Sequence, residues 1–416
     1  MPPKANVRKL AATALGRWRS GHVYADSLVG ELAQKHGLSS ADRGLLNAIV
    51  LGSLRNLSLL DHFISVLRPG GRLDDSMRDL LRVGLCQLLI LELPEHASVN
   101  ETVNAAPRHL KGLANGVLRS ALRRKDELLA GVQKLPLATR YSHPEQLVSR
   151  WEKLFGREET IALLEWNQKP ANTFVRINKL KPGRHKEVRD SGLGELFAPD
   201  NRFLEVKGPV PPLWFKDGLV YGQDPATRHS VELLSPQPGE VILDACAAPG
   251  GKAALAADAM ANQGRLICTD SNDKRLPRLE GNLETLGVKI AEVLQHDWTE
   301  ACPEALRGRC DGVLLDVPCS NTGVLRRRVD ARWRHSGNTR DELISIQRNI
   351  LKNALQAINR TGRIVYSTCS IDPSENGDLV RSVIADTTDF LISKEIQVLP
   401  QVDQTDGAYA ALIERA

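Results

Sequence analysis

The sequence has few aromatic residues, few cysteines and no long apolar run, and each shortage excludes a class of protein. Aromatic side chains make up 4% of the 416 residues, too few for the exposed Phe and Tyr platforms on which some RNA-binding sheets stack bases. No apolar stretch approaches the roughly 18 residues that a membrane span requires, so we expect no membrane partner. With 42% hydrophobic and 25% charged residues, the composition is that of a globular protein.

The seven cysteines are scattered, without a C-x-x-C pair, and the ten histidines form no H-E-x-x-H or zinc-finger spacing. This pattern argues against a disulfide framework and against bound metal. Unpaired cysteines are typical of a reducing compartment, so we expect a cytoplasmic protein, and a monomer. The acid-free start, residues 1–25, has the composition of a transit peptide, but helical spacing of its apolar residues from Arg8 to Trp18 favours an ordinary first helix.

Charge is distributed unevenly along the chain. Residues 1–135 contain 19 Lys and Arg against 12 Asp and Glu, a net charge of +7, whereas the remainder has a net charge of −2. A basic first third predicts a module that binds a polyanion such as RNA. A solvated helical surface that happens to be basic explains the charge equally well.

The apolar spacing divides the chain into three predicted domains. Residues 1–138 show helical periodicity almost throughout, with segments at residues 40–63, 74–91 and 100–124, the last divided at residues 111–116. Residues 139–225 combine two short helical patterns with a strand at residues 173–177, which predicts a small α+β domain. From residue 226 to 416 strands and helices alternate, which predicts a Rossmann-like α/β domain.

Five short apolar runs of the third domain have the length of strands, at residues 241–245, 266–269, 291–294, 312–315 and 363–367. Because they alternate with helices, we expect a parallel sheet with helices on both faces. Ligands of such sheets bind outside the carboxyl ends of the strands. The residues that follow each run are therefore the candidates for a functional site.

The first run continues as Asp244-Ala-Cys-Ala-Ala-Pro-Gly-Gly-Lys252 directly into a helix. Its glycines allow close approach of a ligand to the backbone, and the helix start offers free N–H groups. A Walker phosphate loop is excluded by Cys246 and Ala253, and no G-x-G-x-x-G fingerprint occurs. Asp270 ends the second run, 19 residues past Gly251, where a carboxylate can accept both hydroxyls of a ribose. Together these features favour S-adenosylmethionine as the ligand.

Two cysteines follow later strands of the same predicted sheet. Cys319 lies in Asp316-Val-Pro-Cys-Ser320, and Cys369 in Thr368-Cys-Ser370. A thiolate beside a methyl donor suits methylation of carbon 5 of a pyrimidine, because addition at carbon 6 makes carbon 5 enamine-like. Asp316 is placed to support the charge shift at N3 of the base, and the second cysteine to assist release of the product.

Cys369 is the better candidate nucleophile on this reasoning. Asp372-Pro-Ser-Glu375 has the pattern of a helix start, with an N-cap Asp and a capping-box Glu. A helix that begins there stabilises a nearby thiolate. Between the two cysteines, residues 324–328 and 332–334 supply five arginines and Trp333, a composition that suits phosphate and base contacts or simply a solvated loop.

These motifs resemble those of the RNA cytosine-5 methyltransferases. The resembling segments are Ala247-Ala-Pro-Gly-Gly-Lys252, Asp316-Val-Pro-Cys-Ser320 and Thr368-Cys-Ser370 with Pro373, Glu375 and Asn376. The first domain resembles NusB through His96-Ala-Ser-Val-Asn-Glu101 and Gly112-Leu-Ala-Asn-Gly-Val-Leu118. That combination is similar to the B type of bacterial enzymes that methylate small-subunit ribosomal RNA.

The resemblance implies a role for each matching residue. Cys369 would be the nucleophile, and Cys319 would assist release of the methylated RNA. The implied contacts to S-adenosylmethionine are Cys246, Ala247, Ala248, Pro249, Gly250, Gly251, Lys252, Asp270, Asp297 and Asp316. Asp297 is implied by the resemblance alone, since by itself it has the pattern of a turn.

Three positions depart from the family pattern and bear on the fit of the target loop. Val317 replaces the more usual Ala, Val329 stands where a Pro is usual, and Ala408 lies where an aromatic pair is expected. The expected function is methylation of a cytidine in small-subunit ribosomal RNA. The same reaction on transfer RNA shares every catalytic residue, and a non-catalytic RNA-binding assembly factor is the remaining alternative.

Overall fold

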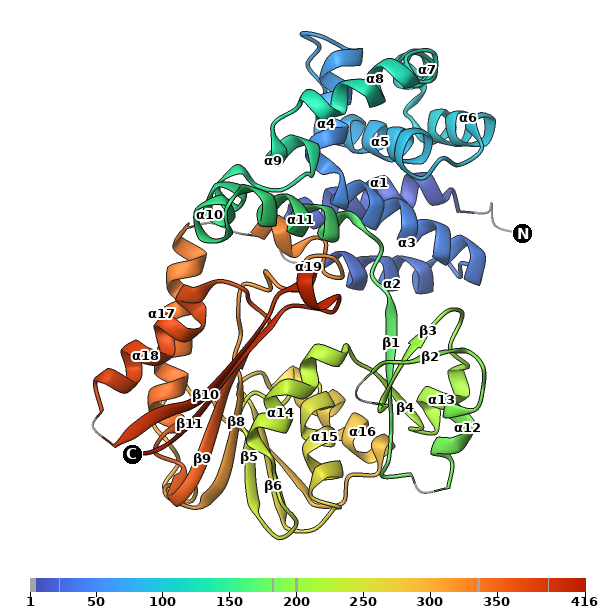
Figure 1. Cartoon of the computed structure of the whole chain (residues 1–416). Helices are drawn as coiled ribbons and strands as arrows, with labels where there is room; N and C mark the ends of the chain where they lie inside the picture. Colours follow the sequence, from blue (N-terminus) through green and yellow to red (C-terminus); the bar gives the residue numbers. More distant parts are fainter. Residues whose placement is uncertain (1–4, 22, 182, 199–200, 335–336, 388) are drawn as a thin grey trace. The chain divides into compact units, whose positions relative to one another are not determined.

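The computed structural model describes residues 5–21, 23–181, 183–198, 201–334, 337–387 and 389–416. The chain divides into two compact units (Figure 1), one formed by residues Met1–Lys169 with Arg328–Arg334 and the other by Pro170–Arg327 with His335–Ala416. The second unit contains residues 170–225 of the predicted middle domain and most of the predicted catalytic domain, whereas residues 139–169 of the predicted middle domain lie in the first unit. The boundaries at residues 138 and 225 stay a prediction.

The first unit is built of helices, as the periodicity predicts. They are α1 (Val7–Arg19), α2 (Ala25–Lys35), α3 (Ser40–Arg55), α4 (Leu57–Leu67), α5 (Asp75–Leu85), the π-helical η1 (Cys86–Ile90), α6 (Glu95–Ala105), η2 (Arg108–Leu110), α7 (Lys111–Arg123), α8 (Lys125–Gly131), η3 (Val132–Lys134), α9 (Leu137–Arg140), α10 (Glu145–Phe155), α11 (Arg157–Gln168) and η6 (Ala331–Arg334). Several start at polar caps: the side chain of Asn6 accepts from the N–H groups of α1, Ser39 from α3 and Asp74 from α5.

The predicted break at residues 111–116 was wrong. Those residues form the first turns of α7. The helix instead ends at Ala105, the last residue of α6, and Pro107 follows two residues later. A proline has no N–H to donate and disfavours helix at the residue before it, so it ends the pattern more effectively than glycines do. Among the described residues no single helix is long and apolar enough to cross a membrane, although α3 and α4 together, bent by 80°, have the length and composition.

Residues Arg328–Arg334 belong to the helical unit although they lie far along the sequence. The carboxylate of Asp330 accepts from the N–H of Ala25 at 2.9 Å, and so caps the start of α2. Val329 is buried in the same apolar cluster as residues of α1, α2 and α3. This packing gives Val329 a place in a core rather than in an exposed loop.

The second unit begins with a small antiparallel sheet in the order β2-β3-β1-β4. Its elements are β1 (Thr173–Ile177), α12 (His185–Arg189), β2 (Gly194–Leu196), β3 (Phe203–Val206), α13 (Pro212–Lys216) and β4 (Val220–Gly222). The strand predicted at residues 173–177 is confirmed. Asn178 ties this sheet to the rest of the unit, because its amide donates to the carbonyl of Leu286 at 2.8 Å.

The rest of the unit is a seven-stranded sheet in the order β10-β11-β9-β8-β5-β6-β7, with helices between its strands. The elements are η4 (Pro225–Thr227), α14 (Arg228–Leu234), β5 (Val241–Asp244), α15 (Gly251–Ala259), β6 (Arg265–Asp270), η5 (Asp273–Arg275), α16 (Leu276–Leu286), β7 (Ala291–Gln295), β8 (Cys310–Asp316), α17 (Gly337–Ala354), β9 (Ile358–Thr368), η7 (Pro373–Glu375), α18 (Gly377–Ala385), β10 (Phe390–Val398), α19 (Pro400–Asp403) and β11 (Ala408–Arg415). Strands β5 to β9 are parallel, as predicted, whereas β10 and β11 add an antiparallel edge that the sequence did not predict.

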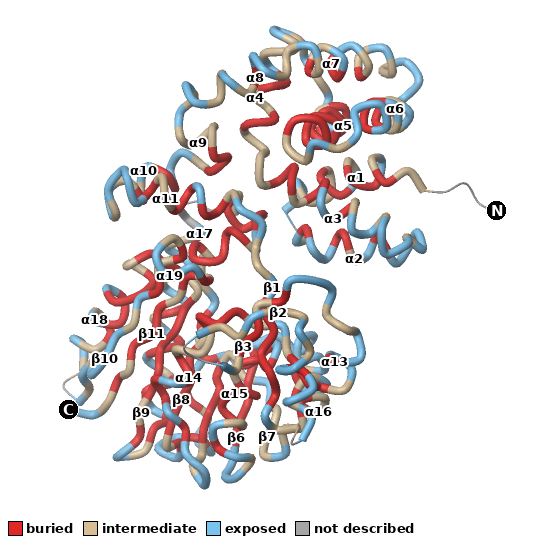
Figure 2. Tube along the Cα trace, turned by 45° about the vertical axis from the view of Figure 1, so that its right-hand side comes forward, coloured by how far each residue is buried: buried red, intermediate tan, exposed pale blue. Residues whose placement is uncertain are grey.

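The two faces of this sheet are covered by different helices, and the buried strands run between them (Figure 2). Successive residues of β5 point to opposite faces: Leu243 packs in one core with α17 and α18, and Ile242 in another with α15 and α16. The Rossmann-like class of the third domain is therefore confirmed. Its topology brings the ends of β5, β6, β8 and β9 to one edge of the sheet.

Candidate functional site

The candidate site lies at the carboxyl ends of the parallel strands. Asp244 ends β5, Asp270 ends β6 and Asp316 ends β8. Cys369 directly follows β9, and Asp297 lies two residues beyond β7. Because β8 pairs with both β5 and β9, the acidic strand ends and the cysteine loops are neighbours.

The loop from β5 to α15 has the close-approach geometry that its glycines predict. Gly250, the N-cap of α15, has φ 104°, in the left-handed region that favours glycine. A Cβ on Gly251 would lie 2.7 Å from the ring of Tyr221, so no larger residue fits there. Residues Cys246 to Lys252 thus present backbone at the end of β5, with the start of α15 behind it.

Lys252 forms an ion pair with the carboxylate of Asp316, so the donor loop is joined to the loop that contains Cys319. Burial opposes the charged form of Lys252, but the Asp316 carboxylate outweighs it and the pKa of Lys252 is raised. The Asp316 side chain remains 36% exposed and can still meet a ligand. Its second neighbour is Ser367, whose hydroxyl donates to it at 3.4 Å.

Asp270, the last residue of β6, supports the loop from Cys246 to Lys252, which is the candidate loop for binding the methyl donor. Its carboxylate accepts from the N–H of Ala248 at 3.3 Å and pairs with Arg275, which in turn donates to the carbonyl of Ala248. Asp297 is exposed and accepts from the N–H of Thr299 at 2.9 Å. The turn that the sequence indicates at Asp297 is therefore present.

Asp244 was missed by the sequence reasoning, although it opens the donor motif. Its side chain is buried, and burial, together with the carboxylate of Asp316, raises its pKa to about 7; Lys252 opposes the shift. A strand-ending Asp is too common for the sequence alone to mark it. Asp244 lies near Asp270 and Asp316 only because β5 is placed between β6 and β8 in the sheet, and the sequence does not give this strand order.

The two cysteines meet across the ends of β8 and β9. The sulfur atoms of Cys319 and Cys369 lie 3.1 Å apart, and the Cys369 sulfur also contacts Oδ1 of Asn321 at 3.4 Å. A backbone hydrogen bond also links the two cysteine loops: the N–H of Gly323 donates to the carbonyl of Cys369 at 2.9 Å. The hydrogen bond with the Cys369 sulfur, followed by burial, raises the pKa of the Cys319 thiol well above its ordinary value.

The helix predicted to begin at Asp372 is a single 3-10 turn, so the helix-dipole argument for Cys369 was wrong. Asp372 does cap that turn, accepting from Ser374, but α18 begins only at Gly377, after an irregular Asn376. Glu375 does not close a capping box. It instead bonds to Ser320 and Ser370, which follow the two cysteines.

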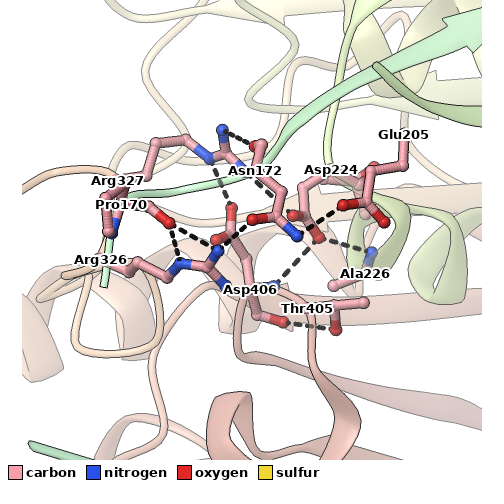
Figure 3. Close-up of polar contacts among 10 residues, drawn as sticks. Pro170, Asn172, Glu205, Asp224, Ala226, Arg326, Arg327, Thr405 and Asp406 are labelled. Atoms are coloured by element: carbon pink, nitrogen blue, oxygen red, sulfur yellow. Dashed lines mark hydrogen bonds and ion pairs between the residues drawn. The ribbon is translucent and has the colours of Figure 1, made fainter. Parts of the chain in front are cut away.

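Four of the five arginines in residues 324–334 bond to other parts of the protein. Figure 3 shows Arg326 donating to the carbonyl of Pro170 at 2.7 and 2.9 Å, and Arg327 pairing with Asp224 and Asp406 at 3.1 and 3.0 Å. In the helical unit, Arg332 is fully buried and Trp333 donates to the carbonyl of Leu54. These side chains therefore have partners within the protein, whereas Arg328 is exposed, and the expected phosphate and base contacts stay a prediction.

The site suits a nucleoside-type methyl donor with a positive charge. Asp244, Asp270 and Asp316 bring carboxyl groups to the strand ends, where Lys252 pairs with Asp316 and Arg275 with Asp270. The glycine turn leaves backbone room at the start of α15. Among the described residues no group of three or more His, Cys, Asp or Glu side chains is arranged to hold a metal ion.

Comparison with known proteins agrees with this geometry. Residues 231–414 match the family described as 16S rRNA methyltransferase RsmB/F, and residues 5–123 match the NusB family. The chain is 34% identical over 436 aligned positions to the ribosomal RNA small subunit methyltransferase B of Escherichia coli O127:H6 and to that of Shigella sonnei. Each alignment covers 100% of both proteins.

Two solved structures share the fold. The crystal structure of PH0851 matches 100% of this chain and 99% of its own, with a TM-score of 0.80 and 24% identity. NSun6 from Pyrococcus horikoshii, solved with SFG, matches 65% of this chain and 98% of its own, with a TM-score of 0.58 and 21% identity. With full-length relatives above 30% identity, and with a family model that matches residues 231–414, which include the strand ends described above, the chain belongs to the RsmB/F family of S-adenosylmethionine-dependent ribosomal RNA methyltransferases.

Proposed function

We propose that this enzyme methylates carbon 5 of a cytidine in small-subunit ribosomal RNA through a covalent bond between Cys369 and carbon 6. The observation that supports this most directly is the 3.1 Å contact between the sulfurs of Cys369 and Cys319, beside Asp316. Methylation of an exposed nitrogen or oxygen atom would not require a pair of thiols. A pyrimidine carbon does require a nucleophile that activates the ring.

The reaction assigns one step to each group. The Cys369 sulfur bonds to carbon 6, and the electrons of the carbon 5–carbon 6 double bond shift toward N3, which takes a proton through Asp316, the partner of the Lys252 ammonium group. N3 returns this proton to Asp316 when carbon 5 is methylated. Carbon 5 then takes the methyl group from S-adenosylmethionine, whose sulfonium sulfur keeps the bonding electrons. Loss of the proton from carbon 5 re-forms the double bond and expels Cys369 as a thiolate.

Cys319 is suited to take that proton only after the bond to RNA has formed. In the free enzyme its pKa is raised by the contact with the Cys369 sulfur and by burial, so it remains a thiol. When Cys369 becomes a neutral thioether, its charge no longer opposes ionisation of Cys319. This change in the charge of Cys369 favours Cys369 as the nucleophile and Cys319 as the base that removes the proton from carbon 5.

The methyl donor would be held by the segment Cys246 to Lys252 together with Asp270, Asp297 and Asp316. It supplies an electrophilic methyl group, while the chain's own residues orient the base and move its proton. Free cysteines support a reducing compartment such as the cytoplasm. The monomeric state stays a prediction.

The test uses purified enzyme, small-subunit ribosomal RNA and S-adenosylmethionine with a labelled methyl group. Cys369→Ser should abolish transfer, and Cys319→Ser should accumulate an RNA–protein adduct on denaturing gels. An adduct formed by Cys369→Ser instead would reverse the two roles. Label recovered in any nucleoside other than 5-methylcytidine, or transfer to transfer RNA in preference to ribosomal RNA, would overturn the proposed product or substrate.

A further inference from the structure

A buried glutamate lies between the two cysteine loops. Glu375 has no solvent exposure, and its carboxyl group accepts from four donors. These are the N–H of Ser320 at 2.8 Å, the hydroxyl of Ser320, the hydroxyl of Ser370 at 2.8 Å and the side-chain amide of Gln347 at 3.0 Å. The four donors come from the β8 loop, the β9 loop and α17.

The two serines are the residues next to the cysteines. Ser320 follows Cys319 and Ser370 follows Cys369, so each serine is one peptide unit from a reacting sulfur. Gln347 reinforces the same link, because its amide also donates to the carbonyl of Pro318, just before Cys319, at 2.9 Å. Through Glu375, the position of one cysteine loop therefore depends on that of the other.

The chemistry of the contacts explains why a carboxyl group stands here. A carboxylate only accepts hydrogen bonds and has about four lone-pair sites, which matches four converging donors. A buried acid is costly unless its hydrogen bonds are complete. A capping residue would lie at the exposed first turn of a helix, whereas Glu375 also has its backbone carbonyl bound by the hydroxyl of Tyr366 at 2.7 Å.

We propose that Glu375 is a positioning residue. It holds the Cys319 and Cys369 loops at the separation that methyl transfer and release of the RNA require. The inference rests on the proposed two-cysteine mechanism for its catalytic meaning. The geometric part, a link that fixes the two sulfurs in contact, is independent of that mechanism. Glu375 itself touches neither sulfur in the contacts described, so its effect on the reaction is exerted through the loops.

Glu375→Ala removes all four acceptor contacts, whereas Glu375→Gln keeps the shape and can accept from the Ser320 N–H while its own amide faces the two hydroxyls. A displacement of the loops by about 1 Å lowers kcat roughly 100-fold, so that loss is expected for Glu375→Ala. Glu375→Gln should stay within roughly threefold of the parent, because the two hydroxyls can turn to accept from the new amide and the net effect of such exchanged hydrogen bonds is modest. Val383→Ala, in the buried side of α18, serves as a control that destabilises the same domain and leaves the hydrogen bonds of Glu375 in place.

Two readouts separate positioning from general destabilisation. The first is the fraction of enzyme present as RNA adduct during turnover, which should rise in Glu375→Ala because Cys319 no longer lies beside the adduct sulfur. The second needs no RNA: the equilibrium of the Cys319–Cys369 disulfide against a glutathione buffer, in which the two thiols lose two electrons and two protons to oxidised glutathione. This equilibrium reports the effective concentration of one thiol at the other, and it should fall at least about tenfold in Glu375→Ala.

The inference fails if Glu375→Ala and Val383→Ala change kcat, adduct fraction and thiol equilibrium alike. If the thiol equilibrium falls in Glu375→Ala while Cys319→Ser shows no adduct, the positioning role stands and the covalent mechanism is wrong. Should Glu375→Ala not fold, the double variant Ser320→Ala with Ser370→Ala removes the hydroxyl contacts and is measured in the same assays. An unchanged thiol equilibrium in that variant also overturns the inference.

Discussion

The fold moves the ionisation of Asp244 into the neutral pH range. This residue is buried at the end of β5, and its pKa of about 7 results first from burial and then from the Asp316 carboxylate. In the unfolded chain the same group has an ordinary pKa near 4. Between these values the folded protein binds a proton that the unfolded chain has already lost.

The stability of the protein should therefore fall as the pH rises from about 4 to about 7, and then level off. A pKa difference of about three units between the folded and the unfolded chain corresponds to a change of up to about 4 kcal/mol in the free energy of unfolding. Asp244→Asn should remove this dependence, since its side chain stays neutral at every pH. The measurement is the melting temperature of both proteins between pH 5 and pH 8. Parallel curves would show that Asp244 is not the titrating group.

Asp270 tests the donor site at the level of one side chain. Its contacts to the Ala248 N–H and to Arg275 hold the loop that would surround S-adenosylmethionine. Asp270→Ala should weaken donor binding by roughly 10- to 100-fold, the range expected when a charged hydrogen-bonding group is lost, and leave RNA affinity unchanged. Isothermal calorimetry with the donor and anisotropy with RNA separate the two. Unaltered donor affinity would remove Asp270 from the site.

The sequence predicted the location of single residues where they belong to a motif. It did not predict contacts between residues that are far apart in the sequence. The sequence placed Cys319 and Cys369 at the same sheet edge because the ends of parallel strands coincide. It interpreted Glu375 as a capping-box acid because only its neighbours in sequence were visible. Its true partner, Ser320, is 55 residues away, and no local pattern reports such a contact.

The segment Arg328–Arg334 shows at the level of an element how a composition can mislead. Residues 324–334 contain five arginines and a tryptophan, three of these arginines within Arg328–Arg334, and this composition suggested an RNA-binding loop. Arg332 instead donates to the carbonyls of Arg55, Ser142 and Asn167 at 3.1 to 3.3 Å. Arg55 and Asn167 stand at the carboxyl ends of α3 and α11, where a cation is favourable. The segment is a structural part of the helical unit.

Arg332→Ala should therefore destabilise the helical unit by about 3 kcal/mol or more, because three buried carbonyls would lose their donor. Burial lowers the pKa of Arg332 to about 9, so the side chain is still charged at neutral pH. Thermal unfolding and hydrogen exchange of α3 and α11 measure the loss. Arg309→Ala, at an exposed position, is the control. Equal stability of both variants would contradict the structural role.

The antiparallel strands β10 and β11, of which β10 lies at the edge of the sheet, were missed for a related reason. Most residues of β10 are exposed or half-buried, and its short apolar start, residues 390–392, is followed by Ser393, Lys394 and Glu395, so the strand as a whole has a mixed pattern. Central parallel strands are buried on both faces and are visible as continuous apolar stretches. An edge strand is recognised only when its partner is known, and here that partner is β11.

For the whole molecule, the order of motifs along the chain was enough to predict an all-helical unit followed by a doubly wound sheet. The relation between residues 328–334 and the helical unit was not predictable, because it joins segments about 300 residues apart. It also changes how RNA binding should be tested. Deleting residues 1–135 would remove the packing partners of Arg328–Arg334, so substitution of exposed charges is the cleaner experiment.

The helical unit has the excess positive charge, and Arg108, Arg119 and Arg123 lie exposed on η2 and α7. Replacing all three by Gln should weaken binding to ribosomal RNA and lower the slope of log affinity against log salt by up to about 2, since each phosphate contact to a single strand contributes about 0.7. Lys186, Arg189 and Lys394, exposed in the second unit, are changed to Gln as a set of equal charge, and that set should leave the slope nearly unaltered. Anisotropy titrations between 50 and 300 mM KCl measure both proteins. If the two triple variants lose the same slope, the RNA senses only net charge, and the basic face of α7 is not a binding surface.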